Sequence, residues 1–106
     1  MTCYTLGIDI GTSTIKIALV SQLTGAVVHT VTTENCAYTI EYLSGKTNKA
    51  EQVVCSVVDT LQELLLKAID KQTRKKISAV CISGQMHGVV QWKLGNMKDC
   101  TNLVTW

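Results

Sequence analysis

A chain of 106 residues, of which 46% are hydrophobic and 17% charged, is long enough for one modest core and too apolar to be disordered. Its net charge of +2 gives no support for binding nucleic acid or a membrane surface, and no apolar run approaches the ~20 residues of a membrane span. Five scattered cysteines without a Cys-x-x-Cys spacing indicate neither a zinc site nor a disulfide framework. Because no basic leader precedes the first apolar run either, we expect free thiols in a reduced, cytoplasmic protein.

The first third of the chain is rich in β-branched residues and predicts three strands. Thr5 to Ile10 forms the first strand, and Thr14 to Val20 forms the second. A turn from Ser21 to Gly25, whose glycine can take positive φ, precedes a third strand from Ala26 to Thr33. Because the links between these strands are short, we expect an antiparallel meander.

An amphipathic helix is predicted after an irregular, polar stretch from Asn35 to Lys49. Asn48 and Glu51 have the spacing of a capping box, and basic residues crowd the far end, where the helix dipole favours cations. Between them, apolar residues recur at the three- and four-residue spacing of one helix face: Val53, Val54, Val57, Val58, Leu61, Leu64, Leu65, Ala68 and Ile69. We therefore predict a helix over about Lys49 to Gln72.

The last third of the chain again predicts strands. Ile77 to Ile82 is a continuous apolar run, typical of a strand buried on both faces, and Val89 to Leu94 forms another. A long helical link precedes the Ile77 strand, so we expect it to lie parallel to the first strand. The chain closes on "TNLVTW", which reads as one more strand. Because a domain rarely ends inside a strand, we expect the chain to be incomplete.

The opening stretch places a carboxylate and a polar turn after a strand that reads as buried on both faces. Asp9 would be costly to keep charged there, and a divalent metal would remove that cost. Gly11 lets a phosphate approach the backbone, while Thr12, Ser13 and Thr14 supply hydroxyls and N–H groups for an anion. These residues suit a nucleotide phosphate site. The alternative interpretation is an ordinary hairpin turn capped by Asp9.

A second polar stretch follows the Ile77 strand. Gly84 and Gly88 bracket Gln85, Met86 and His87 at a strand end, which is where open α/β sheets place ligands. The amide and the imidazole could bind hydroxyls, and the methionine offers an apolar wall. A plain β-turn with a packed methionine and a surface histidine is the alternative.

Together the two stretches resemble the amino-terminal part of the FGGY carbohydrate kinases. "GIDIGTSTIKIALV" is similar to the first phosphate motif of the wider actin, sugar-kinase and heat-shock ATPase superfamily. "SGQMHG" resembles the branch that acts on ketoses, the xylulokinases and sedoheptulokinases, and "GVVQWK" with the closing "LVTW" is similar to sedoheptulokinases in particular. "AEQVV" resembles the family's Glu-Gln-Asp segment, with Val53 where an acid is common. The resemblance runs through the whole chain but covers only the first part of a full kinase.

The resemblance implies ATP-dependent phosphorylation of a ketose, with sedoheptulose to its 7-phosphate favoured over xylulose. By the same resemblance Asp9 helps to place Mg²⁺, and the Gly11–Thr14 turn with Lys16 faces the ATP phosphates. Met86 and His87 lie against the sugar, and we assign Gln85 to the same substrate-binding loop. Because the two stretches follow strands that should be neighbours in one parallel pair, we expect this loop to lie close to Asp9. The family's catalytic base is an Asp further downstream, and the adenosine-binding domain follows it. Residues 1–106 would then be a partial N-terminal sugar-kinase domain that is inactive alone.

The implied fold class is α/β and ribonuclease-H-like: a three-stranded antiparallel meander, a crossover helix and a parallel strand. Two alternatives of different class remain. One is a truncated, non-catalytic product that acts as a binding or interaction module. The other is a non-kinase ATPase of the superfamily, which is disfavoured because nothing in that role requires "SGQMHG".

Overall fold

The structure is a computed structural model, and it describes residues 2–35, 39–41, 50–85, 88, 90–101 and 103–105. The chain divides into two compact units, one of Met1–Asn35 with Leu61–Gly84 and the other of Cys36–Thr60 with Gln85–Trp106. In the described part of the chain, no helix is long and apolar enough to cross a membrane.

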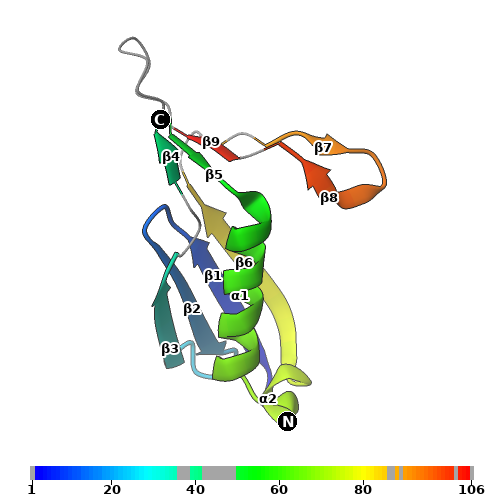
Figure 1. The fold of residues 1–106 in the computed structure, drawn as a ribbon. Coiled ribbons are helices and arrows are strands. Elements are labelled where there is room, and N and C mark those ends of the chain that lie inside the picture. Colours follow the sequence, from blue (N-terminus) through cyan, green and yellow to red (C-terminus); the bar gives the residue numbers. More distant parts are fainter. Residues whose placement is uncertain are drawn as a thin grey trace. The chain divides into compact units, whose positions relative to one another are not determined.

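The first unit is built on a four-stranded sheet (Figure 1). Its strands lie in the order β3-β2-β1-β6, with bounds β1 Tyr4–Ile10, β2 Thr14–Ser21, β3 Val27–Glu34 and β6 Ile77–Gly84. The β1–β2 and β2–β3 pairs are antiparallel and the β1–β6 pair is parallel. The predicted meander and the predicted parallel strand are therefore confirmed. Gly25, in the turn between β2 and β3, has a φ of +74°, as the turn chemistry predicts.

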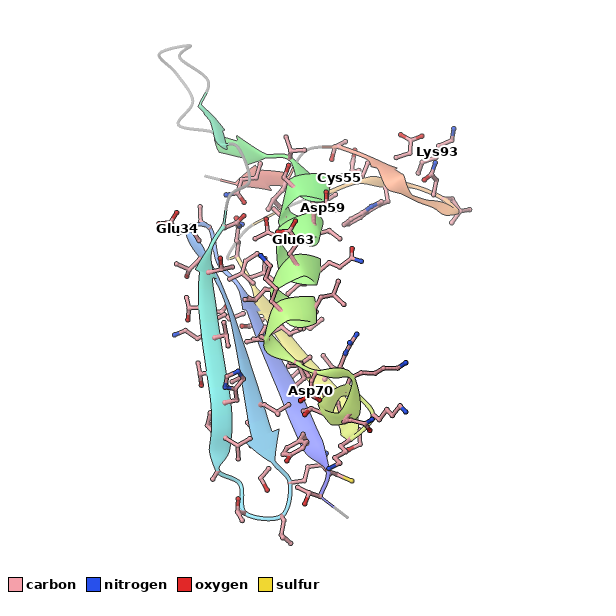
Figure 2. All side chains as sticks on the ribbon, turned by 60° about the horizontal axis from the view of Figure 1, so that its bottom comes forward. Glu34, Cys55, Asp59, Glu63, Asp70 and Lys93 are labelled. Carbon is pink, nitrogen blue, oxygen red and sulfur yellow. The ribbon has the colours of Figure 1, made fainter. Side chains whose placement is uncertain are left out.

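One face of this sheet forms the core of the first unit. Alternation along β1 and β2 places five buried aliphatic side chains on that face: Leu6, Ile8, Ile15, Ile17 and Leu19. The part of helix α1 (Val54–Ala68) from Leu61 onward belongs to this unit and runs across the same sheet in Figures 1 and 2. Leu64 on α1 and Ile69, which directly follows the helix, are buried in this unit. Each fully buried aliphatic side chain contributes about 1.5–3 kcal/mol, so this face holds the unit together.

The helix is shorter than the predicted span of about Lys49 to Gln72. It begins at Val54, and Ala50–Gln52 instead forms the strand β5. Those three residues pair with strands on both sides, and this backbone pairing outweighs the high intrinsic helix propensity of Ala, Glu and Gln. The predicted capping box involves Asn48, which lies outside the described residues. Of the residues in the predicted apolar stripe, Val57, Leu64 and Ile69 are buried, whereas Val58 is exposed.

A separate four-residue helix, α2 (Lys71–Arg74), occupies the predicted basic end of the helix. Asp70, labelled in Figure 2, is its N-cap. The Oδ1 atom of Asp70 accepts a hydrogen bond of 2.7 Å from the backbone N–H of Thr73. This bond, with smaller help from the Arg74 charge, lowers the pKa of Asp70 below its ordinary value. An ionised Asp70 is therefore the form that stabilises the start of α2.

The second unit contains two small sheets. A three-stranded antiparallel sheet has the order β4-β5-β9, with β4 Thr39–Glu41 and β9 Leu103–Thr105. The strand β4 lies within the stretch that was predicted to be irregular, whereas β9 confirms the predicted closing strand. Within the predicted strand from Val89 to Leu94, Trp92–Lys93 forms β7, which makes a hairpin with β8 (Asn96–Cys100). Val90 and Gln91 are not in a strand, and Val89 lies outside the described residues.

Candidate functional site

Asp9 lies near the end of β1, on the sheet face opposite to the core. Its cross-strand neighbours in register are Lys16 on β2 and Ser83 on β6. The Ser83 hydroxyl donates a hydrogen bond of 2.9 Å to the Asp9 Oδ1 atom. A hollow of about 330 Å³ opens over this face, and it is lined by Gly7, Ile8, Asp9, Lys16, Ala18, Cys81, Ile82 and Ser83. A carboxylate and an ammonium thus face one surface depression, within one compact unit.

The prediction that β1 and β6 are strands buried on both faces is wrong. Asp9 is exposed, and β6 is exposed along its length apart from Ile77, with Val80 and Ile82 exposed by 53% and 66%. The reason is that the described residues of this unit cover only one face of the sheet and leave β6 at its edge. The argument that a buried Asp9 needs a metal to offset desolvation therefore fails. Any role of Asp9 rests on its accessibility instead.

The turn that follows β1 is tight and closed internally. The Gly11 N–H donates to the Thr14 carbonyl oxygen over 2.9 Å, and a Cβ on Gly11 would meet that same oxygen at 2.9 Å. No side chain fits there without a shift of the backbone, so the turn requires glycine. Thr12, Ser13 and Thr14 are exposed on the outside of the turn. Their hydroxyls are accessible, as a site for phosphate groups requires.

Asn35 holds this turn from outside, and the sequence reasoning missed it. Its side-chain Nδ2 donates to the Gly11 carbonyl over 2.9 Å, and its backbone N–H donates to the Ser13 carbonyl over 2.8 Å. The sequence reasoning also missed Ser83, the donor to Asp9. The signal for both lay in the strand pairing, since Asn35 directly follows β3 and Ser83 stands opposite Asp9 in the parallel pair.

Gln85, the first residue of the predicted sugar loop, follows β6 directly and belongs to the second unit. Its Nε2 atom donates a hydrogen bond of 2.7 Å to the Oε1 atom of Gln52 on β5. Met86 and His87 lie outside the described residues. The expectation that Asp9 and the Gly11–Thr14 turn lie close to the Gln85–His87 loop therefore stays a prediction.

The donor set at Asp9 fits a Mg²⁺ ion that keeps most of its water. Across the described ranges, no three His, Cys, Asp or Glu side chains are grouped in a way that could hold a metal ion. Mg²⁺ in phosphoryl-transfer sites is commonly held by one or two carboxylates together with the phosphates of the substrate. A single exposed carboxylate beside a hollow is compatible with that mode, and it is not compatible with an all-protein metal cage.

Comparison with known proteins decides the family. Residues 4–106 match the FGGY family of carbohydrate kinases, N-terminal domain. The chain belongs to this family. The resemblance of the two polar stretches to FGGY kinases is thereby confirmed, and the Asp9 turn and the Gln85 loop both fall within the matched residues.

Two kinds of FGGY relative match the chain at similar identity. A sedoheptulokinase from Mus musculus is 33% identical over 96 residues, which covers 86% of this chain and 20% of the relative. The sedoheptulokinase from Homo sapiens is 32% identical over 97 residues. A gluconokinase from Bacillus licheniformis is 30% identical over 106 residues, which covers all of this chain and 19% of the relative. The chain therefore spans about a fifth of the length of these curated relatives.

Solved FGGY kinases share the fold. The crystal structure of gluconate kinase from Lactobacillus acidophilus matches all of the chain with a TM-score of 0.72 and 29% identity, over 20% of its own length. The ligand-bound xylulose kinase from the same organism matches 97% of the chain with a TM-score of 0.70 and 29% identity, over 19% of its own length. The mixed sheet, with one parallel pair and a helix, and these neighbours confirm the predicted ribonuclease-H-like fold class.

Proposed function

We propose that this chain is a partial N-terminal domain of an ATP-dependent kinase that phosphorylates a ketose, and that the ketose is sedoheptulose. The observation that carries the proposal is the family match over residues 4–106, which includes the loop sequence "SGQMHG". The two sedoheptulokinase relatives support sedoheptulose over xylulose. The free thiols of Cys3, Cys55, Cys81 and Cys100 fit a reducing compartment, and we place the enzyme in the cytoplasm.

In this proposal the open face of the first sheet receives the phosphates of ATP. Asp9 helps to hold Mg²⁺, which when bound offsets the negative charge of the phosphates. The Lys16 ammonium adds positive charge to the same hollow, and Ser83 fixes one Asp9 oxygen through its hydrogen bond. The exposed hydroxyls of the Gly11–Thr14 turn donate to phosphate oxygens. Because phosphoryl transfer depends mainly on positioning and charge neutralisation, these groups suit the chemistry.

The sugar is assigned to the loop that follows β6. Gln85, Met86 and His87 supply an amide, an apolar surface and an imidazole, which suit the hydroxyls and carbon faces of a ketose. The catalytic base and the adenosine site belong to the part of the kinase beyond this chain. The proposed enzyme therefore needs the longer protein, and the chain contributes one half of the site.

A gluconate kinase is the second candidate. The gluconokinase relative aligns over all 106 residues, and a gluconate kinase gives the TM-score of 0.72. Gluconate carries a carboxylate where a ketose has a neutral hydroxymethyl group, so the two substrates require different charges in the pocket. Comparing kcat/KM for gluconate and for the ketoses therefore distinguishes the two candidate functions.

A substrate panel on the full-length kinase that contains this chain tests the proposal. Sedoheptulose, xylulose and gluconate are each supplied with MgATP, and ADP release is followed in a coupled assay. We expect the highest kcat/KM with sedoheptulose. A clear preference for gluconate would overturn the ketose assignment, and no ADP release with any of the sugars would favour a non-catalytic binding protein.

A further inference from the structure

Gln52 is a fully buried amide in the middle strand of the second unit's sheet. Its side chain is 1% exposed, and β5 lies between β4 and β9. A buried amide must find hydrogen-bond partners, since leaving one unpaired costs about 1–3 kcal/mol. Gln52 finds one outside the sheet, because its Oε1 atom accepts the 2.7 Å bond from Gln85 Nε2. The sheet and the first residue of the 85–88 segment are thus joined by two side-chain amides.

Gly88, at the other end of the 85–88 segment, contacts β9, the strand next to β5. A Cβ on Gly88 would meet the Leu103 Cδ1 atom at 2.8 Å, so the Gly88 backbone lies directly against the Leu103 side chain. Leu103 on β9 is the cross-strand partner of Gln52 in the sheet register. Gln85 and Gly88 therefore both contact one cross-strand pair, Gln52 and Leu103. This pair fixes both positions relative to the same two strands.

We propose that Gln52 is a positioning residue for sugar recognition, which acts through Gln85. The proposal rests on the proposed function, because Gln85 is assigned there to the sugar. Gln52 holds the Gln85 amide in one orientation, so Gln85 pays less conformational entropy when it binds a hydroxyl. In this proposal Gln52 is buried and does not touch the sugar. The Leu103 side chain, which packs against Gly88, supports the other end of the segment.

A Gln52→Met variant in the full-length kinase tests this role. Methionine preserves the size of the side chain and removes the amide acceptor. We expect the KM for the ketose to rise about two- to tenfold, the range that follows from losing one neutral hydrogen bond. The KM for MgATP should not change. A residue with a purely structural role would instead lower the amount of active enzyme and leave both KM values unchanged.

A double-mutant cycle with Gln85→Met shows whether Gln52 acts through Gln85. In the Gln85→Met background the Gln52→Met change should have no further effect on the ketose KM, because the hydrogen bond is already lost. Additive effects of the two changes would overturn the proposal. Gln62→Met is the matched control, since Gln62 is exposed on α1 and its change should leave all kinetic parameters at the wild-type values.

A further variant keeps the test decisive if Gln52→Met does not fold. Gln52→Asn keeps the amide but is one methylene too short for the contact, and it should raise the ketose KM as the methionine does. A ketose KM of Gln52→Asn equal to that of the wild type would overturn the proposal. Failure of the proposed function is distinct, because it would appear in the wild-type enzyme as no ketose-dependent ADP release.

Discussion

Substituting Asp9 can test its role in activity, because the interactions of this exposed side chain should contribute little to the free energy of unfolding. The carboxylate is exposed, and so is Lys16, its cross-strand neighbour on β2. Because even a paired charge at an exposed position typically contributes only about 0.2–1 kcal/mol, neutralising Asp9 should not unfold the domain. A loss of activity in such a variant would then report on the role of the charge itself.

We expect Asp9→Asn in the full-length kinase to lower kcat by about 10²–10³, the scale of losing one preorganised electrostatic contact. The KM for the ketose should change much less, since Asp9 is assigned to Mg²⁺ and the phosphates. Steady-state kinetics with each substrate varied in turn measures both effects. Asp59→Asn is the matched control, because Asp59 is an exposed carboxylate on α1 (Figure 2).

His87→Ala should show the opposite pattern to Asp9→Asn. Because His87 is assigned to the sugar, its loss should weaken ketose binding more than MgATP binding. Equal and mild effects of both variants on every parameter would mean that both residues are structural, and the assignment of two sites would then be wrong.

At the residue scale, the chemistry of a position was predictable from the sequence and its surroundings were not. The spacing of Asp9, Gly11 and the three hydroxyls indicated a polar turn after a strand, and the structure has that turn. The burial of Asp9 was predicted wrongly, because an apolar run does not reveal whether one or both faces of a strand are covered. Gln52 could not be found, since its partner lies 33 residues away in the sequence, and Asn35, 24 residues from Gly11, was indicated only by the pairing of β3 with β2.

At the scale of elements, local patterns determined the type of most elements and long-range pairing determined the boundaries. The three- and four-residue spacing identified α1, and β-branched residues identified β1 to β3, with clear alternation in β2. Ala50–Gln52 was assigned to the helix because Asn48 and Glu51 have capping-box spacing just before the apolar stripe, yet these three residues pair with Thr39–Glu41 and Leu103–Thr105. A partner some 50 residues away leaves no local signal. The split of the basic end into α2 depends on Asp70, whose side chain starts a new helix.

The cap at Asp70 predicts a pH dependence of stability. The folded pKa of Asp70 is lowered, so the ionised cap stabilises the fold at neutral pH, and this contribution is lost as the pH falls below about 4 and through the folded pKa. Asp70→Ala should therefore lower the urea midpoint at pH 7, and the gap to the wild type should close in acid. Urea unfolding curves across this pH range measure the gap.

Asp70→Asn is the control for that experiment. Asparagine caps helices about as well as aspartate but does not titrate, so its advantage over alanine should persist in acid. A gap between Asp70→Ala and the wild type that stays constant with pH would contradict the assigned role of the ionised cap.

At the scale of the whole molecule, the open edge of the first sheet determines how the 106-residue chain behaves in solution. β6 is an edge of that sheet, and its sequence "ISAVCISG" contains neither a charge nor a proline. Long, apolar, uncharged edge strands pair readily with other chains. We expect the isolated chain to associate as its concentration rises, with Ile82→Lys reducing that association in light scattering.

Leu94→Lys separates edge pairing from general stickiness in this experiment. Leu94 is fully exposed in the β7–β8 turn, so its change removes a comparable apolar side chain and adds the same charge away from the edge. Association should fall more in Ile82→Lys than in Leu94→Lys. Equal effects would show that exposed apolar area, and not the β6 edge, drives the association.

The 106-residue chain alone should transfer no phosphoryl group. It spans about a fifth of the length of its relatives, and the proposed function assigns the catalytic base and the adenosine site to the rest of the kinase. Without a positioned base, the sugar hydroxyl has no acceptor for its proton, a loss typically of 10²–10⁴ in rate. The described side of the phosphate site is also an open sheet face, so water is not excluded from the hollow at Asp9.

A coupled ADP-release assay on the monomeric 106-residue chain, with sedoheptulose, xylulose and MgATP, measures whether the chain alone transfers a phosphoryl group. Ketose-dependent ADP production well above the blank would mean that the residues needed for transfer all lie within these 106 positions, and the proposed division of the site between two parts of a longer kinase would be wrong.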